Sequence, residues 1–269
     1  MDNKLNQLQT LLPAGVLVDA EWLQARGYSR SLIAKYVKSG WLEQPTRGAY
    51  RRAGSAPVRE TAPWPMVVLS LQQLRPPLFA LGGRTALELQ GYGHYLTPQG
   101  VSEVHLYGAS TPPVWARRLL EPQLVFHRSR LFVEDPLLQP EPSPALLAAH
   151  LTRPDREGVS GLLKVSTPER AMLELLDDVP HAASFHEADK LIESLSNLSP
   201  RRLSVLLTDC RSVKVKRLAL WYADRHGHAW AKHLERAQID LGVGNRVLEP
   251  GGRLDRTYRI TVPREMEAA

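Results

Sequence analysis

The N-terminal segment has the hydrophobic spacing of a small helical unit. Leucines recur at helical intervals over Leu5–Leu12, and Gly15–Val18 is a short apolar run that suits a small strand. Asp19 is a residue type that caps a helix N-terminus, and Gly27 is the type that ends a helix. The pattern therefore predicts a helix, a short strand and a second helix before residue 28.

A third helix is predicted from about Ser29 to Lys38. Its apolar positions share one side, as in a helix that packs inward on that side; they are Leu32, Ile33, Tyr36 and Val37. Residues 41–42, 44–48 and 49–51 then read as strand, turn and strand. This order of helices, strand and hairpin is that of a winged helix-turn-helix domain.

The composition changes after residue 53, where Gly, Ser, Ala and three prolines gather before residue 66. Such a stretch is typical of a linker, and a chain of 269 residues is long for one core. We therefore predict an α+β protein with a winged helix-turn-helix domain at residues 1–55, a linker at 56–65 and a larger mixed α/β C-terminal domain at 66–269.

Within the larger domain, strand-like and helix-like segments alternate. Strands are predicted at 79–81, 102–107 and 124–132, and helices at 85–90, 114–120, 213–225 and 228–236. Thr167-Pro168-Glu169 and Ser199-Pro200 are helix start signals. A final hairpin is predicted over 246–262, with Gly251-Gly252 between its strands.

The chain is basic, and most of the excess charge lies near its N-terminus. The formal net charge is +6, and residues 1–53 hold eight Lys and Arg against four Asp and Glu. The overall balance suits nucleic acid and an anionic membrane surface equally. The concentration in the first fifty residues favours DNA, because that segment is the predicted helix-turn-helix.

In a helix-turn-helix domain, the N-terminal residues of the recognition helix reach base edges in the major groove. The forked guanidinium of Arg30 matches the O6/N7 pair of guanine, and Ser29 at a helix N-terminus suits a phosphate. Arginines of the hairpin would lie over the backbone or the minor groove. The predicted DNA-binding residues are Ser29, Arg30, Ser31, Lys35, Lys38, Arg47, Arg51 and Arg52. A protein-interaction face on a basic three-helix unit is the alternative.

A second basic segment lies between residues 201 and 217. Lys214 and Arg217 are three apart and are predicted to share an outer helix face. The candidates for an auxiliary DNA or RNA contact are Arg201, Arg202, Lys214 and Arg217. An ordinary solvated helical face explains the same residues, and both interpretations stay open.

Several short motifs follow one another in order along the chain. They are Gly27-Tyr28-Ser29 with Arg47-Gly48-Ala49-Tyr50, then Leu81-Gly82-Gly83-Arg84-Thr85-Ala86-Leu87 through Gly91-Tyr92, then Ser166-Thr167-Pro168-Glu169-Arg170-Ala171, and finally Leu241-Gly242-Val243-Gly244 with Pro250-Gly251-Gly252-Arg253-Leu254. In this order they resemble the AbiEi antitoxins of bacterial type IV toxin–antitoxin systems. The resemblance covers most of the chain, although each motif alone occurs in unrelated proteins.

The resemblance implies a transcription regulator with two roles. Its N-terminal domain would bind inverted repeats in double-stranded promoter DNA and repress its own operon. Its C-terminal domain would counteract a nucleotidyltransferase-like toxin without a stable complex. No catalytic residue is carried over from the family, so we expect neither an enzyme nor a cofactor.

Other chemistry finds little support in the sequence. The one cysteine, Cys210, excludes a disulfide framework and a Cys-rich zinc finger. His226, His228 and His233 do not stack on one helix face, so no metal site is predicted. No apolar stretch approaches the roughly 18 residues of a membrane span and no signal peptide is visible. We therefore expect a soluble cytoplasmic protein without a membrane partner.

Two rival functions stay open. One is a stand-alone winged-helix transcription factor whose C-terminal domain senses a ligand or dimerises. The other is a nucleic-acid-processing enzyme such as a nuclease. The acid and lysine two positions apart that mark restriction-type metal sites occur only as Asp2 and Lys4, outside the larger domain.

Overall fold

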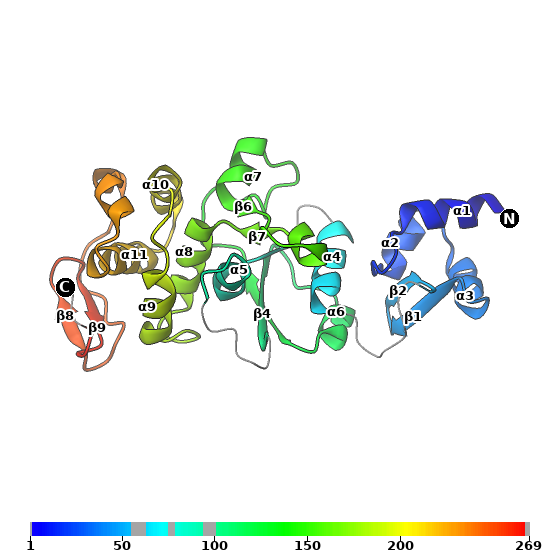
Figure 1. The fold of residues 1–269 in the computed structure, drawn as a ribbon, viewed down its shortest axis with the longest axis horizontal. Helices are drawn as coiled ribbons and strands as arrows, with labels where there is room; N and C mark the ends of the chain where they lie inside the picture. The colour runs from blue at the N-terminus through cyan, green and yellow to red at the C-terminus, as the bar shows by residue number, and fades with distance from the viewer. Residues whose placement is uncertain (1, 55–62, 75–78, 94–100, 267–269) are drawn as a thin grey trace.

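The computed structural model describes residues 2–54, 63–74, 79–93 and 101–266. The chain is elongated, with an N-terminal helical unit at one end, a mixed sheet and its helices in the middle, and a small hairpin at the other end (Figure 1). This combination of helices and mixed sheets confirms the predicted α+β class. Most of the predicted linker, 56–65, lies outside the described residues, and α4 begins at Trp64.

Three short helices form the N-terminal unit: α1 (Asp2–Leu11), α2 (Ala20–Ala25) and α3 (Arg30–Lys38). Both predicted caps are confirmed, because Asp19 accepts from the amide of Trp22 at 2.7 Å and Ser29 accepts from that of Leu32 at 3.3 Å. The apolar faces of the three helices meet in one core, which includes Leu8, Leu12, Leu23, Tyr28, Ile33 and Tyr36.

A β-hairpin completes this unit, with β1 (Leu42–Thr46) antiparallel to β2 (Ala49–Arg52). A five-residue turn at 44–48 was predicted, but β1 continues through Pro45 to Thr46, with an irregular register that tolerates the proline. The turn itself needs Gly48, whose φ is 93°. The predicted strand at 15–18 is reduced to one bridge, in which Val18 and Tyr50 exchange two hydrogen bonds of 2.8 Å.

Helix α4 (Trp64–Leu74) links the N-terminal unit to the rest of the chain. The buried amide of Leu17 donates to Ser70 Oγ at 2.9 Å, and Ser70 Oγ donates to the carbonyl of Met66 at 2.6 Å. Leu17 and Ala49 pack into the same large core as α4. Although α4 is apolar, neither it nor any other helix in the described ranges is long and apolar enough to cross a membrane.

The central sheet has the strand order β5-β4-β3-β7-β6. Its strands are β3 (Phe79–Leu81), β4 (Glu103–Gly108), β5 (Gln123–Arg128), β6 (Leu151–Thr152) and β7 (Val165–Ser166). The strand predicted at 124–132 ends at Arg128. Helix α6 (Val114–Leu119) joins β4 to β5, which are parallel as a crossover connection requires. Helix α5 (Gly83–Leu89) directly follows β3, and α7 (Pro144–His150) leads into β6.

Helix α8 (Pro168–Asp178) lies at the centre of the larger domain. Thr167 caps it and Pro168 occupies its first turn, as predicted, and every residue from Glu169 to Leu176 is buried. Among the described residues, its main helix contacts are with α5, α9 (Phe185–Glu193), α10 (Pro200–Asp209) and α11 (Val213–Arg225). The sequence predicted the bounds of α11 but missed α9, which starts at a capping box formed by Ser184 and Glu187.

The C-terminal segment differs from its prediction in two places. The expected helix at 228–236 is two 3-10 turns, Ala229–His233 and Arg236–Gln238, and a further 3-10 turn spans Gly158–Leu162. The final hairpin is present as β8 (Arg253–Asp255) and β9 (Ile260–Val262), but Gly251 and Gly252 precede it rather than form its turn. The turn lies at residues 256–259.

We predict that Ser70→Ala destabilises the attachment of the N-terminal unit. The substitution leaves the buried amide of Leu17 without its acceptor, which costs about 1–3 kcal/mol. Urea denaturation of the full chain measures this loss. Ser110→Ala, at an exposed position, should change the free energy of unfolding by less than about 0.5 kcal/mol; equal effects of the two variants would refute the role of Ser70.

Candidate functional site

The outward face of α3 carries three cationic residues. Arg30, Lys35 and Lys38 are exposed, whereas Ile33 and Tyr36 are buried in the N-terminal core. At about 100° per residue, the exposed positions share an arc of about 140°. The sequence of α3 contains no acidic residue. The helix therefore presents cations on one side and packs with the other, which is what binding in a DNA groove requires.

The three hairpin arginines differ in exposure and in their partners. Arg47 is exposed at the turn. Arg51 is 8% exposed, and its Nε donates to Glu43 Oε2 on the opposite strand at 2.8 Å. Arg52 is partly exposed and donates to the carbonyl of Gln9 in α1 at 3.2 Å.

Contacts within the fold occupy much of the second basic segment. Lys214 Nζ donates to two backbone carbonyls at the end of α8, those of Asp177 and Val179, at 2.6 and 2.8 Å. Arg202 donates to the buried carboxylate of Glu169 at 3.1 Å. Arg201 is exposed, and its role in nucleic-acid binding stays a prediction.

Arg217 is only 1% exposed, so the prediction that it shares an outer face with Lys214 is wrong. Its guanidinium donates to the carbonyl oxygens of Leu241, Gly244 and Arg259, at 2.8, 2.8 and 3.1 Å. This side of α11 faces the C-terminal loop and hairpin instead of solvent. Arg217 therefore joins α11 to the C-terminal loop and hairpin through hydrogen bonds within the protein.

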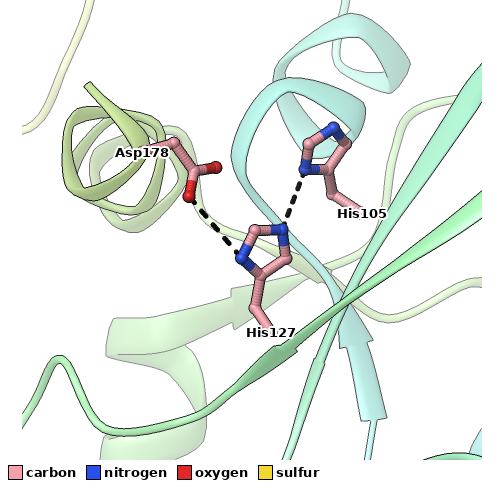
Figure 2. Close-up of side chains that lie close together, drawn as sticks. All are labelled: His105, His127 and Asp178. Atoms are coloured by element: carbon pink, nitrogen blue, oxygen red, sulfur yellow. Dashed lines mark hydrogen bonds and ion pairs between the residues drawn. The ribbon is translucent and has the colours of Figure 1, made fainter. Parts of the chain in front are cut away.

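A row of four polar side chains crosses one face of the central sheet. Strand β4 carries Glu103 and His105, β5 carries His127, and Asp178 ends α8. His105 Nδ1 lies 3.0 Å from His127 Nε2, and His127 Nδ1 lies 3.6 Å from Asp178 Oδ1 (Figure 2). At the other end, His105 Nε2 lies 3.5 Å from Glu103 Oε2. We call these four residues the polar row.

The pairing of β4 with β5 explains how two histidines 22 residues apart meet. The strands are parallel with Tyr107 opposite His127, so His105 lies diagonally across from His127 on the same face. The two imidazoles have centroids 5.2 Å apart and planes 17° apart. Since their facing nitrogens are only 3.0 Å apart, the rings meet edge to edge. Tyr107 stacks on His127 with a centroid distance of 4.5 Å.

Burial shifts the titration of the polar row. Desolvation lowers the pKa of His105 and of His127, and for His105 the neighbouring His127 adds to this effect. Burial is the main reason that the pKa of Asp178 is raised to about 6; the charge of His105 opposes this rise and the adjacent carboxylate of Asp177 contributes to it. The two imidazoles are therefore neutral at pH 7, and Asp178 takes up a proton at a higher pH than an ordinary carboxylate does.

A buried charged cluster surrounds Arg170, which lies on the same helix about two turns before Asp178. Arg170 donates to both carboxylate oxygens of Asp135 at 3.0 Å, to Glu174 Oε1 at 2.7 Å and to His150 Nδ1 at 2.8 Å. All four residues are at most 2% exposed. Burial lowers the pKa of Arg170, but the two carboxylates outweigh it and the pKa rises overall. The second oxygen of Glu174 accepts from the amide of Gly83 at 2.9 Å.

A cavity of about 320 Å³ opens beside both groups. Its lining includes His127 and Asp178 from the polar row, Arg170 from the charged cluster, and the side chains of Tyr107 and Ser129. The hydroxyls of Tyr107 and Ser129 are buried and have no hydrogen-bond partner within the part of the chain that the structure describes. The cavity is therefore polar and retains unused hydrogen-bonding capacity.

Two family models match the sequence and together span nearly the whole chain. The model described as "Transcriptional regulator, AbiEi antitoxin, Type IV TA system" matches residues 101–263. The model of the AbiEi antitoxin N-terminal domain matches residues 1–98. The chain belongs to the AbiEi antitoxin family. The resemblance predicted from its short motifs is thus confirmed, and the AbiEi chain is a transcriptional regulator of a type IV toxin–antitoxin system.

A solved structure shares the fold of the AbiEi chain. The crystal structure of the RV2827C protein from Mycobacterium tuberculosis superimposes with a TM-score of 0.57 and 18% sequence identity, covering 96% of this chain and 89% of that chain. At this identity the likeness concerns the fold alone. No curated protein sequence matches the AbiEi chain.

Sequence reasoning missed the polar row of the AbiEi chain. It predicted both strands, and the alternation of a strand places Glu103, His105 and Tyr107 on one face. That face pattern was the available signal. It does not reveal that β5 lies parallel beside β4, nor that the end of α8 covers His127, because both depend on tertiary packing.

We predict that His150 makes the stability of the AbiEi chain fall in mild acid. Burial, and then the charge of Arg170, lower the pKa of His150 to about 4, whereas an unfolded histidine titrates near 6.5. The unfolded state therefore binds more protons between these values, and stability present at pH 7 is lost as the pH falls through them.

In His150→Asn, the amide oxygen replaces Nδ1 as acceptor for Arg170. Between pH 7 and pH 5 the wild type should lose about 2 kcal/mol more unfolding free energy than this variant, as measured by urea denaturation at each pH. The exposed His233→Asn should follow the wild type. Parallel curves for wild type and His150→Asn would contradict the assignment.

Proposed function

We propose that the AbiEi chain represses its own operon through residues 1–55, acting as a winged helix-turn-helix domain on inverted repeats in promoter DNA. We further propose that residues 66–269, joined by a linker at 56–65, counteract a nucleotidyltransferase-like toxin in the cytoplasm without a stable complex. The observation that carries the DNA-binding proposal is the cationic outer face of α3, opposite an apolar face packed into the N-terminal core.

The geometry of α3 supports different proposed roles for its residues. Arg30 and Ser31 lie in the first turn, the part of a recognition helix that reaches base edges. Ser29 caps the helix, and Lys35 and Lys38 lie one and two turns further along the same face. We assign base reading to Arg30, and phosphate contacts to the lysines and to the helix N-terminus.

The hairpin supports the second part of the DNA contact. Its strand β2 is tied to the helical core through Val18 and Tyr50, so the position of the turn relative to α3 is fixed. Arg47 at that turn is the phosphate-contacting arginine of the hairpin. Arg51 acts by holding the two strands together through Glu43, and Arg52 by joining the hairpin to α1.

The toxin-directed role rests on family membership alone. The family description names an antitoxin of a type IV system, and the match that carries this description covers residues 101–263. Because the DNA-binding candidates lie in the N-terminal unit, the two roles use different parts of the chain and are separable by mutation.

For DNA binding, we predict that Arg30→Ala weakens specific promoter binding by about 1–3 kcal/mol and relaxes base preference. Arg47→Ala should weaken binding to all sequences alike and reduce the salt slope by about one. Fluorescence anisotropy on operator and scrambled duplexes, over a range of salt concentrations, measures both effects.

The control for these two variants is Arg153→Ala, which removes an exposed arginine of the larger domain and should bind as wild type. If Arg30→Ala and Arg47→Ala also bind as wild type, this surface is not the DNA-binding surface. A loss of affinity in all three variants would instead indicate non-specific binding by net charge.

For the antitoxin role, we predict that Arg30→Ala still rescues growth when it is co-expressed, from an unrelated promoter, with the product of the gene immediately downstream. The reason is that repression and neutralisation use separate domains. Growth curves of cells expressing toxin alone, with wild type and with the variant measure this, at matched protein levels.

Two outcomes would contradict the antitoxin proposal. A neighbour that does not affect growth would favour a stand-alone transcription factor. Metal-dependent DNA cleavage by the purified chain, abolished by one acidic substitution, would favour an enzyme. Loss of rescue by Arg30→Ala would instead show that neutralisation needs the DNA-binding surface.

A further inference from the structure

In the polar row, three pairs of facing nitrogen or oxygen atoms could each share a proton, but the two neutral imidazoles supply only two. Each neutral imidazole carries one N–H, so His105 and His127 together supply two protons. The contact between His105 and His127 is of hydrogen-bond length, whereas the outer nitrogens lie farther from Glu103 and Asp178, at 3.5 and 3.6 Å. If one ring donates to the other, its outer nitrogen faces a carboxylate with a lone pair. The geometry is therefore unsatisfied in its simplest neutral form.

We propose that His105 and His127 bind a divalent transition-metal ion of the zinc class through their facing nitrogens, with Asp178 and Glu103 orienting the two rings. An ion between His105 Nδ1 and His127 Nε2 accepts both inner lone pairs. Both N–H groups are then left for the outer nitrogens, which face Asp178 and Glu103. Metal-bound histidines ordinarily donate their other N–H to a carboxylate in this way.

The distances suit such an ion after a small adjustment. Zinc binds imidazole nitrogen at about 2.0–2.1 Å, so two nitrogens at a tetrahedral angle lie about 3.3 Å apart. The facing nitrogens are 3.0 Å apart, so the rings need to separate by a few tenths of an ångström. One ligand atom from each of His105, His127 and Asp178 lies within 4.8 Å of the other two.

The surroundings favour a cation at this point. Asp177 and Asp178 end α8, where the helix dipole places partial negative charge. Lys214 is a cationic neighbour of this pair, with its Nζ 3.7 Å from Asp177 Oδ1. His127 and Asp178 also line the neighbouring cavity of about 320 Å³. An ion here would tie β4 and β5 to the end of α8.

The test is a titration of the full chain, stripped of metal by chelator and dialysis, with Zn²⁺ by calorimetry and with Co²⁺ by visible absorption. We expect one ion per chain, cobalt bands typical of four or five ligands, and a rise in Tm on adding Zn²⁺. Asp178→Asn should weaken binding about 10–100-fold, the usual effect of losing an outer partner. His127→Gln should weaken it by more than about 100-fold, because it removes a ligand.

The matched control is His233→Gln, which removes an exposed histidine and should bind as wild type. If His127→Gln proves unfolded by circular dichroism, the wild-type titration still decides. Absence of Zn²⁺ and Co²⁺ binding at micromolar concentrations would show that His105 and His127 form only a hydrogen-bonded pair. Binding that persists undiminished in folded His127→Gln would place the ion elsewhere. Either result overturns the proposal.

Discussion

The larger domain depends on keeping a charged guanidinium satisfied inside its core. Arg170 is fully enclosed, and Asp135, Glu174 and His150 surround it from a loop, its own helix and the end of α7. Removing one partner of such a buried pair leaves an uncompensated charge, at a cost of about 3–5 kcal/mol. The cluster therefore specifies how α8 sits against the sheet, and the position of α8 in turn sets Asp178 beside His127.

In the N-terminal unit, the charged side chains of α3 are exposed instead of buried. Its charges lie outside, on α3, and its packing relies on apolar residues such as Ile33 and Tyr36. Its link to the larger domain includes one buried hydrogen bond, from the amide of Leu17 to Ser70 on α4. Exposed cations suit a surface that binds a polyanion such as DNA. Buried, paired charges suit a domain whose helices and strands must keep one arrangement. This division matches the separation of regulator and antitoxin roles that we propose.

The sequence predicted the elements well where the signal was local. Ser29 and Thr167 marked helix starts that the structure contains, and α11 has the predicted bounds. Helix α9 was missed although Ser184 and Glu187 form a local capping box. Side-chain partners were harder to predict. The spacing of Arg217 along the helix predicts an exposed cation. It is buried because the C-terminal loop folds over α11. The meeting of His105 and His127 likewise depends on strand order, which periodicity does not contain.

Arg217 holds the C-terminal tip, residues 241–259, through three backbone carbonyl oxygens, and this affects how far the sequence of the tip can vary. A guanidinium that grips backbone oxygens places no demand on the side chains of the residues it holds. Val243 and Val247 in this loop are 89% and 72% exposed, so packing does not constrain them either. Relatives are thus free to exchange the outward residues of the tip while retaining its shape. Lysine, which lacks the planar fork, is a poor substitute for the arginine beneath it.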